Sequence, residues 1–269
     1  MTKKVETFYD PATFTLTYIV FDESSKDSVV IDPVMDFNPV NGETSNHSVE
    51  KLVKFINDNN LNLKYILETH AHADHLTGAK VLKSFYPQAM VAIGENITKV
   101  QEVFKDKLEM DMTTNGEQFD VLLKDEQIIN AGSIAIKTIF TPGHTPACSS
   151  FLIDDMIFTG DALFMPDFGT GRCDFPAGSS KDLYHSVHEK LYSLPDETRV
   201  FTGHDYQPGG RELKWESTIG ENKLKNIHLK VQTSEEEFVK MRDGRDANLM
   251  EPKLLLPSIK ANIVGGKES

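Results

Sequence analysis

The sequence predicts an α/β protein in which two β-sheets pack together with helices on the outside. Three observations support this fold class. Apolar segments rich in β-branched and aromatic residues recur along the chain, as expected of buried strands. Helical patterns are interleaved with these segments in both halves, which is typical of layered α/β proteins. No internal repeat or linker divides residues 1–269, so we expect one domain with a helical and then extended C-terminal region over residues 210–269.

Composition and charge argue against several kinds of partner. The chain has 269 residues, of which 39% are hydrophobic and 26% are charged, and its formal net charge is −13. Nucleic acids and anionic membranes attract basic surfaces, so we expect neither as a partner. We find no apolar run of transmembrane length and no signal-peptide pattern, and we therefore expect a cytoplasmic protein. The two cysteines, Cys148 and Cys173, are too few for a disulfide framework.

The first half of the chain alternates between strand and helix patterns. Residues 14–21 (FTLTYIVF) and 28–34 (SVVIDPV) have the composition of strands. Residues 46–58 carry apolar side chains at helical spacing. A short apolar segment at 63–70 (LKYILETH) predicts a further strand, and residues 76–86 (LTGAKVLKSFY) predict a second helix.

The second half of the chain is richer in strands. Residues 101–118 mix charge, helical spacing and a turn, and they predict a surface insertion. Strands are predicted within residues 125–140 and 149–164, where LIDDMIF has the form of a tight hairpin. Residues 179–194 begin with a Ser/Asp cap signal and continue as a helix. A last strand is predicted at 199–206 (RVFTGHDY).

Four of these strands end at residues that can bind a metal. Such polar side chains are expensive to bury unpaired, and strand ends at one edge of a sheet converge in space. Glycines just before three of the candidates permit unusual turns that direct the side chains inward. A lone histidine, or a lone Gly-Asp or Gly-His pair, is more often an ordinary core, surface or turn residue. Together they predict a metal centre, with these candidates: His70, His72, Asp74, His75, His144, Asp161 and His204.

The order of these motifs resembles the metallo-β-lactamase superfamily. The His-x-His-x-Asp-His cluster is followed by Gly-His, Gly-Asp and Gly-His, as in that superfamily. The resemblance implies an αββα sandwich of two mixed sheets with a metal site at their edge. The segments GTGRCDF, SEEEFVKMRD and PSIKANIVGG are further similar to the persulfide dioxygenase branch. Three features depart from it: Cys173 replaces the threonine of eukaryotic members, Val264 replaces a common arginine, and residues 101–118 look longer.

The residue types leave two mechanisms open. If only His70, His144 and Asp161 bind metal, they form the two-histidine, one-carboxylate set of non-haem Fe(II) oxygenases. If all candidates bind, the site is dinuclear with a bridging Asp161 and Zn(II), and it hydrolyses thioesters, as in glyoxalase II, or lactones. The resemblance favours one Fe(II) per chain, with one or two Zn(II) as the alternative. In the iron enzyme, His72, Asp74, His75 and His204 surround the ligands and orient them.

The resemblance also implies a substrate and a reaction. A low-molecular-weight persulfide, such as glutathione persulfide, would react with O2 to give sulfite and the parent thiol. Its carboxylates require positive charge, for which Arg172 is the candidate, although a salt bridge to Asp174 would explain it equally well. Tyr206 would face the same cavity. In the glutathione-dependent hydrolases of the superfamily the C-terminal helical region helps to bind the thiol, and residues 210–230 would do so here, with these cations: Arg211, Lys214, Lys223 and Lys225.

Two further expectations concern the whole molecule. A metal-bound sensor or an inactive binding module would need a damaged ligand set, and all seven candidate positions are intact. We therefore expect an enzyme. A homodimer would be ordinary for an enzyme of this size.

Overall fold

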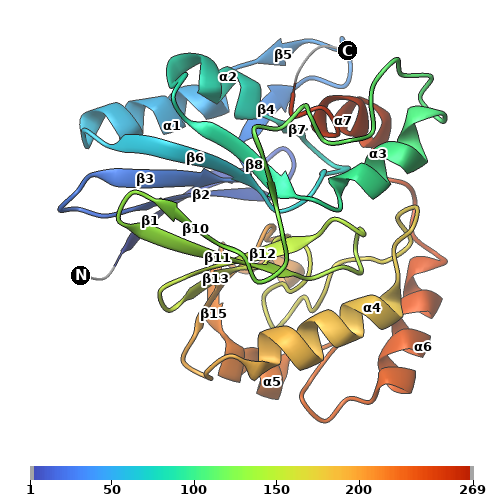
Figure 1. Cartoon of the computed structure of the whole chain (residues 1–269). Helices are drawn as coiled ribbons and strands as arrows, with labels where there is room; N and C mark the ends of the chain where they lie inside the picture. Colours follow the sequence, from blue (N-terminus) through green and yellow to red (C-terminus); the bar gives the residue numbers. More distant parts are fainter. Residues whose placement is uncertain (1–2, 267–269) are drawn as a thin grey trace.

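The computed structural model describes residues 3–266 and arranges them as four layers in the order helix, sheet, sheet, helix (Figure 1). Each of the two large sheets contains both parallel and antiparallel neighbours. The predicted fold class, an αββα sandwich of two mixed sheets, is therefore confirmed.

The first sheet is built from the N-terminal half of the chain. Its strands lie in the order β1-β2-β3-β6-β8-β9. The pairs β1/β2 and β2/β3 are antiparallel, whereas the remaining neighbours are parallel. The strand bounds are β1 Lys4–Asp10, β2 Thr15–Phe21, β3 Asp27–Ile31, β6 Asn62–Glu68, β8 Met90–Gly94 and β9 Val121–Leu123.

The second sheet follows in the C-terminal half, in the order β10-β11-β12-β13-β14-β15. The predicted hairpin is confirmed, because Ile153 pairs with Met156 across the turn between β12 and β13. β13 and β14 are parallel, so the segments that follow them leave the sheet at the same edge. The bounds are β10 Ile128–Ala131, β11 Ile134–Phe140, β12 Ser149–Ile153, β13 Met156–Phe158, β14 Arg199–Phe201 and β15 Glu216–Thr218.

The helices cover the two outer faces. α1, α2, α3 and α7 lie on the first sheet, and α4, α5 and α6 lie on the second (Figure 1). Within residues 3–266, no helix combines the length and apolarity that a membrane span requires. The bounds are α1 His47–Asp58, α2 Ala79–Phe85, α3 Ile97–Lys105, α4 Ser180–His185, α5 Ile219–Lys225, α6 Glu235–Asp246 and α7 Leu255–Asn262. A π-helical turn lies at Ser186–Lys190, directly after α4, and two 3-10 turns lie at Leu191–Ser193 and Pro208–Gly210.

Three apolar clusters fill the spaces between these layers. The first, with Ile19, Leu52 and Ile66, joins the first sheet to its helices. The second, with Phe151 and Phe158, packs the sheets on each other. The third includes Leu183 and Phe238 and joins α4 and α6 to the second sheet. Burial of apolar surface in these three clusters fixes the geometry of the edge of the sandwich, where the strands end.

A small third sheet corrects one predicted boundary. We predicted a helix over 76–86, but β7 (Leu76–Thr77) pairs with β4 (Val34–Phe37), which also pairs with β5 (Thr44–Ser45). The helix begins only at Ala79, whose N–H donates to Thr77 Oγ1 at 3.0 Å. A short strand and a turn at Gly78 therefore replace the first turn of the predicted helix.

The prediction of a surface insertion over residues 101–118 is wrong in part. Phe104, Met110 and Met112 are buried in the first apolar cluster. Gln101 is also buried, and its side-chain amide donates to Ile263 O at 2.8 Å. The segment therefore packs α3 and the C-terminal residues against the first sheet, although its polar side chains give it the composition of a loop.

Within the described residues, the C-terminal region contains α5, α6 and α7 and divides between the two outer faces. We predicted an extended stretch there, but residues 255–262 form α7. Pro257 is the third residue of this helix, where a missing N–H costs no intrahelical hydrogen bond. α6 packs on the second sheet, whereas Ile259 and Ile263 pack on the first.

Candidate metal centre

All seven predicted ligands lie at one edge of the sandwich. Their ligand atoms form two neighbouring groups, and within each group they lie within 4.8 Å of one another. The first group, which we call the triad, contains His70, His144 and Asp161. The second group, which we call the quartet, contains these residues: His72, Asp74, His75 and His204.

Loops that leave strands of both large sheets supply these side chains. The His70–His75 segment follows β6, and His144 lies between β11 and β12. Asp161 follows β13, and His204 follows the parallel strand β14. The four loops are separated in the sequence, and the topology of the two sheets brings them together in space.

Glycine allows two of these loops to approach closely. Gly160, just before Asp161, has φ +49°, and a Cβ there would lie 2.6 Å from Thr69 Oγ1. A Cβ on Gly203, before His204, would lie 2.9 Å from Asp161 Oδ1. A larger residue at either position would push the ligands apart.

His70 is held with one ring nitrogen free. The Thr69 hydroxyl donates to Asp32 Oδ2 at 2.8 Å, and Thr69 Oγ1 lies 3.0 Å from His70 Nδ1. Because its proton is directed to Asp32, Thr69 can only accept from His70, which places the hydrogen of the imidazole on Nδ1. His70 Nε2 is buried and has no hydrogen-bond partner. Burial and the neighbouring histidines lower the pKa of His70 well below its usual value, so the ring is neutral.

His144 is fixed in the same way. Its Nδ1 lies 2.7 Å from the carbonyl oxygen of Arg172, which can only accept, so Nδ1 carries the hydrogen. Its Nε2 lies 3.6 Å from Asp161 Oδ2. Asp161 Oδ1 is buried without a hydrogen-bond partner. Two imidazole lone pairs and one carboxylate therefore converge, which is a donor set suited to a divalent transition metal.

The members of the quartet contact one another instead. Asp74 lies 3.1 Å from His204 Nε2 and 3.4 Å from His75 Nδ1. Burial alone would raise the pKa of Asp74, but the two histidines lower it below its usual range. Thr15 Oγ1 lies 3.3 Å from His75 Nδ1 and 3.5 Å from His204 Nδ1. His72 Nδ1 and His75 Nε2 have no hydrogen-bond partner, so the quartet also offers nitrogens to a metal.

His72 lies beside His70, with ring centroids 4.0 Å apart, and directs its Nε2 towards two buried carboxylates. Its Nε2 lies 3.1 Å from Asp32 Oδ1 and 3.5 Å from Glu68 Oε2. Burial alone would lower the pKa of His72, but Asp32 and Glu68 raise it well above its usual value. A protonated imidazole has no lone pair for a metal, so this contact sets His72 apart from His70.

A cavity of about 640 Å³ opens over the triad. His144 and Asp161 line its floor, with Asp74 beside them. The walls are mostly apolar and aromatic, and four cations also reach the cavity. The aromatic and cationic wall residues include Phe164, Phe168, Tyr206, Arg172, Arg242, Arg245 and Lys253.

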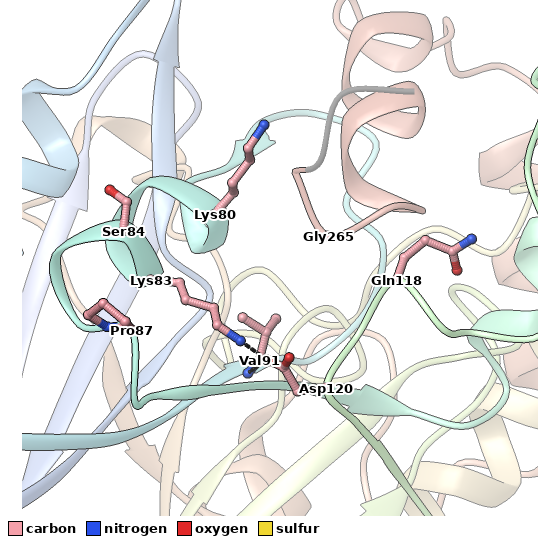
Figure 2. Close-up of a pocket in the computed structure, with 8 residues that line it drawn as sticks. All are labelled: Lys80, Lys83, Ser84, Pro87, Val91, Gln118, Asp120 and Gly265. Carbon is pink, nitrogen blue, oxygen red and sulfur yellow. Dashed lines mark hydrogen bonds and ion pairs between the residues drawn. The ribbon is translucent and has the colours of Figure 1, made fainter.

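A second, smaller cavity lies elsewhere and contains no candidate ligand. Figure 2 shows this space of about 280 Å³ beside α2 and β8, with the Lys83–Asp120 ion pair on its wall. None of the triad or quartet residues lines it. His144, Asp161 and Asp74 line the larger cavity, whereas His75 lines a third cavity of about 360 Å³.

Both predicted substrate residues line the larger cavity. Arg172 is fully engaged: Nε and Nη2 donate to the two oxygens of Asp174 at 2.6 and 2.5 Å, and Nη1 donates to Met250 O at 2.8 Å. The salt bridge that the sequence left open is therefore present. Tyr206 stacks on His204 with ring centroids 5.4 Å apart and on Phe168 at 4.7 Å.

The cations expected from residues 210–230 do not line this cavity. Arg211 pairs with Asp167 and Asp205 instead. The positive charge comes from α6 and the segment after it, through Arg242, Arg245 and Lys253. Arginines three residues apart lie on one side of a helix, and this signal in KMRDGRD could have identified them.

Comparisons with known proteins place the chain among relatives of two kinds. A glyoxylase B2 of Dictyostelium discoideum is 45% identical over 98% of this chain and 91% of its own length. The human mitochondrial persulfide dioxygenase ETHE1 is 34% identical over 97% of this chain and 88% of its own length. A beta-lactamase hydrolase-like protein of Xylella fastidiosa is 43% identical over 99% of this chain, which spans only 61% of that longer protein.

Solved structures show the same arrangement. The crystal structure of ETHE1 from Myxococcus xanthus matches with a TM-score of 0.79 at 30% identity, over 99% of this chain and all of that chain. A metallo-beta-lactamase from Staphylococcus aureus matches with a TM-score of 0.75 at 22% identity and covers 97% and 71% of the two chains, which supports the fold alone. The model of the metallo-beta-lactamase superfamily matches residues 11–204. The chain therefore belongs to the metallo-beta-lactamase superfamily, and persulfide dioxygenases are among its relatives.

Proposed function

We propose that this protein is a persulfide dioxygenase with one Fe(II) per chain. The observation that carries the proposal is the triad, because the ligand atoms of His70, His144 and Asp161 lie within 4.8 Å of one another beside the larger cavity. His72 Nε2 instead faces the carboxylates of Asp32 and Glu68 at 3.1 and 3.5 Å. Two histidines and one carboxylate beneath an open cavity are the ligand set of non-haem iron oxygenases.

The chain's own residues would hold and orient the ligands. His70, His144 and Asp161 would bind the metal, and Thr69 and the Arg172 carbonyl would keep both rings in the binding tautomer. The bound Fe(II) would supply one-electron chemistry between O2 and the persulfide sulfur. The apolar and aromatic walls of the cavity would contact the apolar parts of the substrate.

The substrate would be a persulfide with anionic groups, such as glutathione persulfide. A cavity of about 640 Å³ has room for a thiol of this class. Arg245 and Lys253 line it and form no ion pair within residues 3–266, so they are available for carboxylates, with Arg172 and Tyr206 beside them. In the overall reaction the sulfur–sulfur bond breaks and the parent thiol leaves. The outer sulfur is oxidised to sulfite with both oxygens of O2 and one of water, and two protons are released.

Elemental analysis combined with O2 uptake tests this function. Protein purified without added metal should contain one iron per chain and consume one O2 for each glutathione persulfide converted to sulfite. Two tightly bound zinc ions per chain, with no iron-dependent O2 consumption, would contradict the proposal.

A dinuclear hydrolase is the second candidate function. It is favoured by the quartet, whose ligand atoms lie within 4.8 Å of one another, and by His204 Nε2, which lies 3.5 Å from Asp161 Oδ1. The triad and the quartet would then hold two metals, such as zinc, which would supply an activated water for hydrolysis of a thioester or lactone. Hydrolysis of S-lactoylglutathione by the zinc-loaded protein, at a rate that exceeds its persulfide oxidation when iron-loaded, would support this candidate.

A further inference from the structure

The loop over residues 169–174 supports two of the three triad residues. The carbonyl oxygen of Arg172 accepts from His144 Nδ1 at 2.7 Å, which fixes the tautomer of that ring. One residue earlier, the N–H of Gly171 donates to the Asp161 carbonyl oxygen at 3.1 Å. A Cβ on Gly171 would lie 2.2 Å from this oxygen, so the two backbones are in direct contact. The position of this loop therefore determines how His144 and Asp161 face each other.

Two residues of α6 hold the same loop on both sides of Gly171 and Arg172. Arg242 Nη1 donates to the carbonyl oxygen of Thr170 at 3.2 Å. Asp246 Oδ2 accepts from the backbone N–H of Cys173 at 2.7 Å. Helix α6 thus contacts the residue before and the residue after the pair that supports the triad.

Arg242 and Asp246 are also bound to each other and are buried. Arg242 Nε lies 3.0 and 3.1 Å from the two oxygens of Asp246, and the side chains are 2% and 4% exposed. Burying two charges is expensive even when they are paired, and an apolar pair often gives equal or greater stability. A buried pair that also binds loop atoms on both sides of the supporting residues therefore points to a role in geometry.

His228 completes the attachment. Its Nδ1 accepts from the N–H of Thr170 at 3.0 Å. Burial, together with Arg242 and Arg245, lowers the pKa of His228 to about 4, so its ring is neutral and can accept this hydrogen bond. Thr170 is therefore held through both its carbonyl oxygen and its N–H.

We propose that Arg242 and Asp246 are positioning residues for the metal centre. The buried pair fixes residues 170–173 so that the Arg172 carbonyl selects the metal-binding tautomer of His144 and Gly171 stays bound to Asp161. Arg242 reaches the cavity wall, but its guanidinium donates to Asp246 and Thr170. The inference rests on the metal site of the proposed function and not on the reaction.

Titration of the metal-free protein with Co(II) tests this role. Asp246→Asn keeps the shape of the side chain but removes the charge that holds Arg242. We expect it to bind Co(II) about 10–100-fold more weakly than the parent, as is typical when a group behind a metal ligand is lost. The visible absorption of bound Co(II) should also change, because His144 is no longer held in one orientation.

A double variant and a matched control separate positioning from stability. Arg242→Met with Asp246→Leu leaves no unpaired buried charge, so it should fold even where Asp246→Asn does not, and it should show the same loss of affinity. The control is Ser180→Ala, which removes the 2.6 Å bond from Ser180 Oγ to Asp243 on the same helix without touching the loop. We expect a lower melting temperature for this control, with the Co(II) affinity and spectrum of the parent.

The outcomes distinguish this role from the proposed function. A parent that binds no Co(II) would overturn the metal site and the positioning role together. A parent that binds Co(II), with the same affinity and spectrum in Asp246→Asn and in the double variant, would overturn the positioning role alone. An equal loss of affinity in Ser180→Ala would also overturn it, since the effect would then reflect general loosening of α6.

Discussion

The triad and the quartet use the same residue types but differ in what surrounds them. Each triad histidine gives one nitrogen to an acceptor, Thr69 Oγ1 or Arg172 O, and keeps the other nitrogen directed at Asp161. In the quartet, His72 Nε2 faces Asp32, and His75 and His204 contact Asp74 and the Thr15 hydroxyl, while His72 Nδ1 and His75 Nε2 have no hydrogen-bond partner. The affinity of such a site depends on how the ligands are oriented, and not only on which ligands are present.

Asp32 lies at the boundary between the two groups. One of its oxygens accepts from the Thr69 hydroxyl and so determines the tautomer of His70. The other lies beside His72 Nε2. Asp32 therefore holds His70 in its metal-binding tautomer through Thr69 and contacts the Nε2 of His72 directly.

We expect the largest effect from substitution of the aspartates, because Asp161 belongs to the triad and Asp74 to the quartet. Asp161→Ala removes the only anionic ligand of the triad and should abolish iron binding. Asp74→Ala should retain most of the iron but lower the activity about 10–100-fold. Iron content by elemental analysis and turnover by O2 uptake measure both effects. Equal iron loss in the two variants would contradict the distinction and favour a dinuclear site.

A matched pair of threonine substitutions sharpens the comparison. Thr69 and Thr15 are both buried, and their hydroxyls contact the triad and the quartet, respectively. Thr69→Val removes the acceptor of His70 Nδ1, so we expect about 10–100-fold weaker iron binding. Thr15→Val should bind iron like the parent. The comparison fails if competition with a chelator gives Thr15→Val the larger loss.

A smaller effect concerns stability behind the triad. His228 has a pKa of about 4 in the folded protein, against about 6.5 for an unperturbed histidine. The unfolded chain therefore takes up this proton first, and the group reduces stability as the pH falls from about 7 towards 4. Between about pH 7 and pH 5, His228→Gln should lose about 2 kcal/mol less unfolding free energy than the parent.

Urea unfolding of the metal-free proteins at both pH values measures this difference. The absence of metal matters, because a bound ion would add its own pH dependence. Equal losses in the parent and the variant would show that His228 titrates normally in the folded protein.

The smallest expected effect is that of Cys173, beside Arg172. Burial raises the pKa of its thiol, so the reactive thiolate is disfavoured. The side chain packs in the third apolar cluster, and the attachment to Asp246 is made by its backbone N–H. Cys173→Ser should therefore retain most of the activity. An inactive variant with full iron content would indicate that the thiol itself carries sulfur.

Much of the fold and the seven residues of the triad and quartet could be predicted from the sequence, whereas Asp32 and Glu68, which group with His72, were not among the predicted candidates. The strands that end at His70, His144, Asp161 and His204 are short and strongly apolar, so their pattern is clear. α7 and the buried part of residues 101–118 could not be predicted, because tertiary packing against the first sheet overrides their local pattern.

The division of the ligands into the triad and the quartet could not be predicted from the sequence either. The division depends on the backbone carbonyl of Arg172, which contacts His144, and on the hydroxyl of Thr69, which contacts His70. Neither group belongs to a metal-ligand motif. The Arg242–Asp246 pair has the spacing of a common surface ion pair on a helix. Only its burial against residues 170–173 indicates that it serves the metal centre.

Anomalous diffraction at the iron absorption edge, from crystals of protein purified without added metal, locates the bound metal. We expect one iron peak per chain, bounded by His70 Nε2, His144 Nε2 and Asp161, and no metal peak among the quartet residues. Two peaks with Asp161 between them, or a single peak bound by His75 and His204, would contradict this expectation.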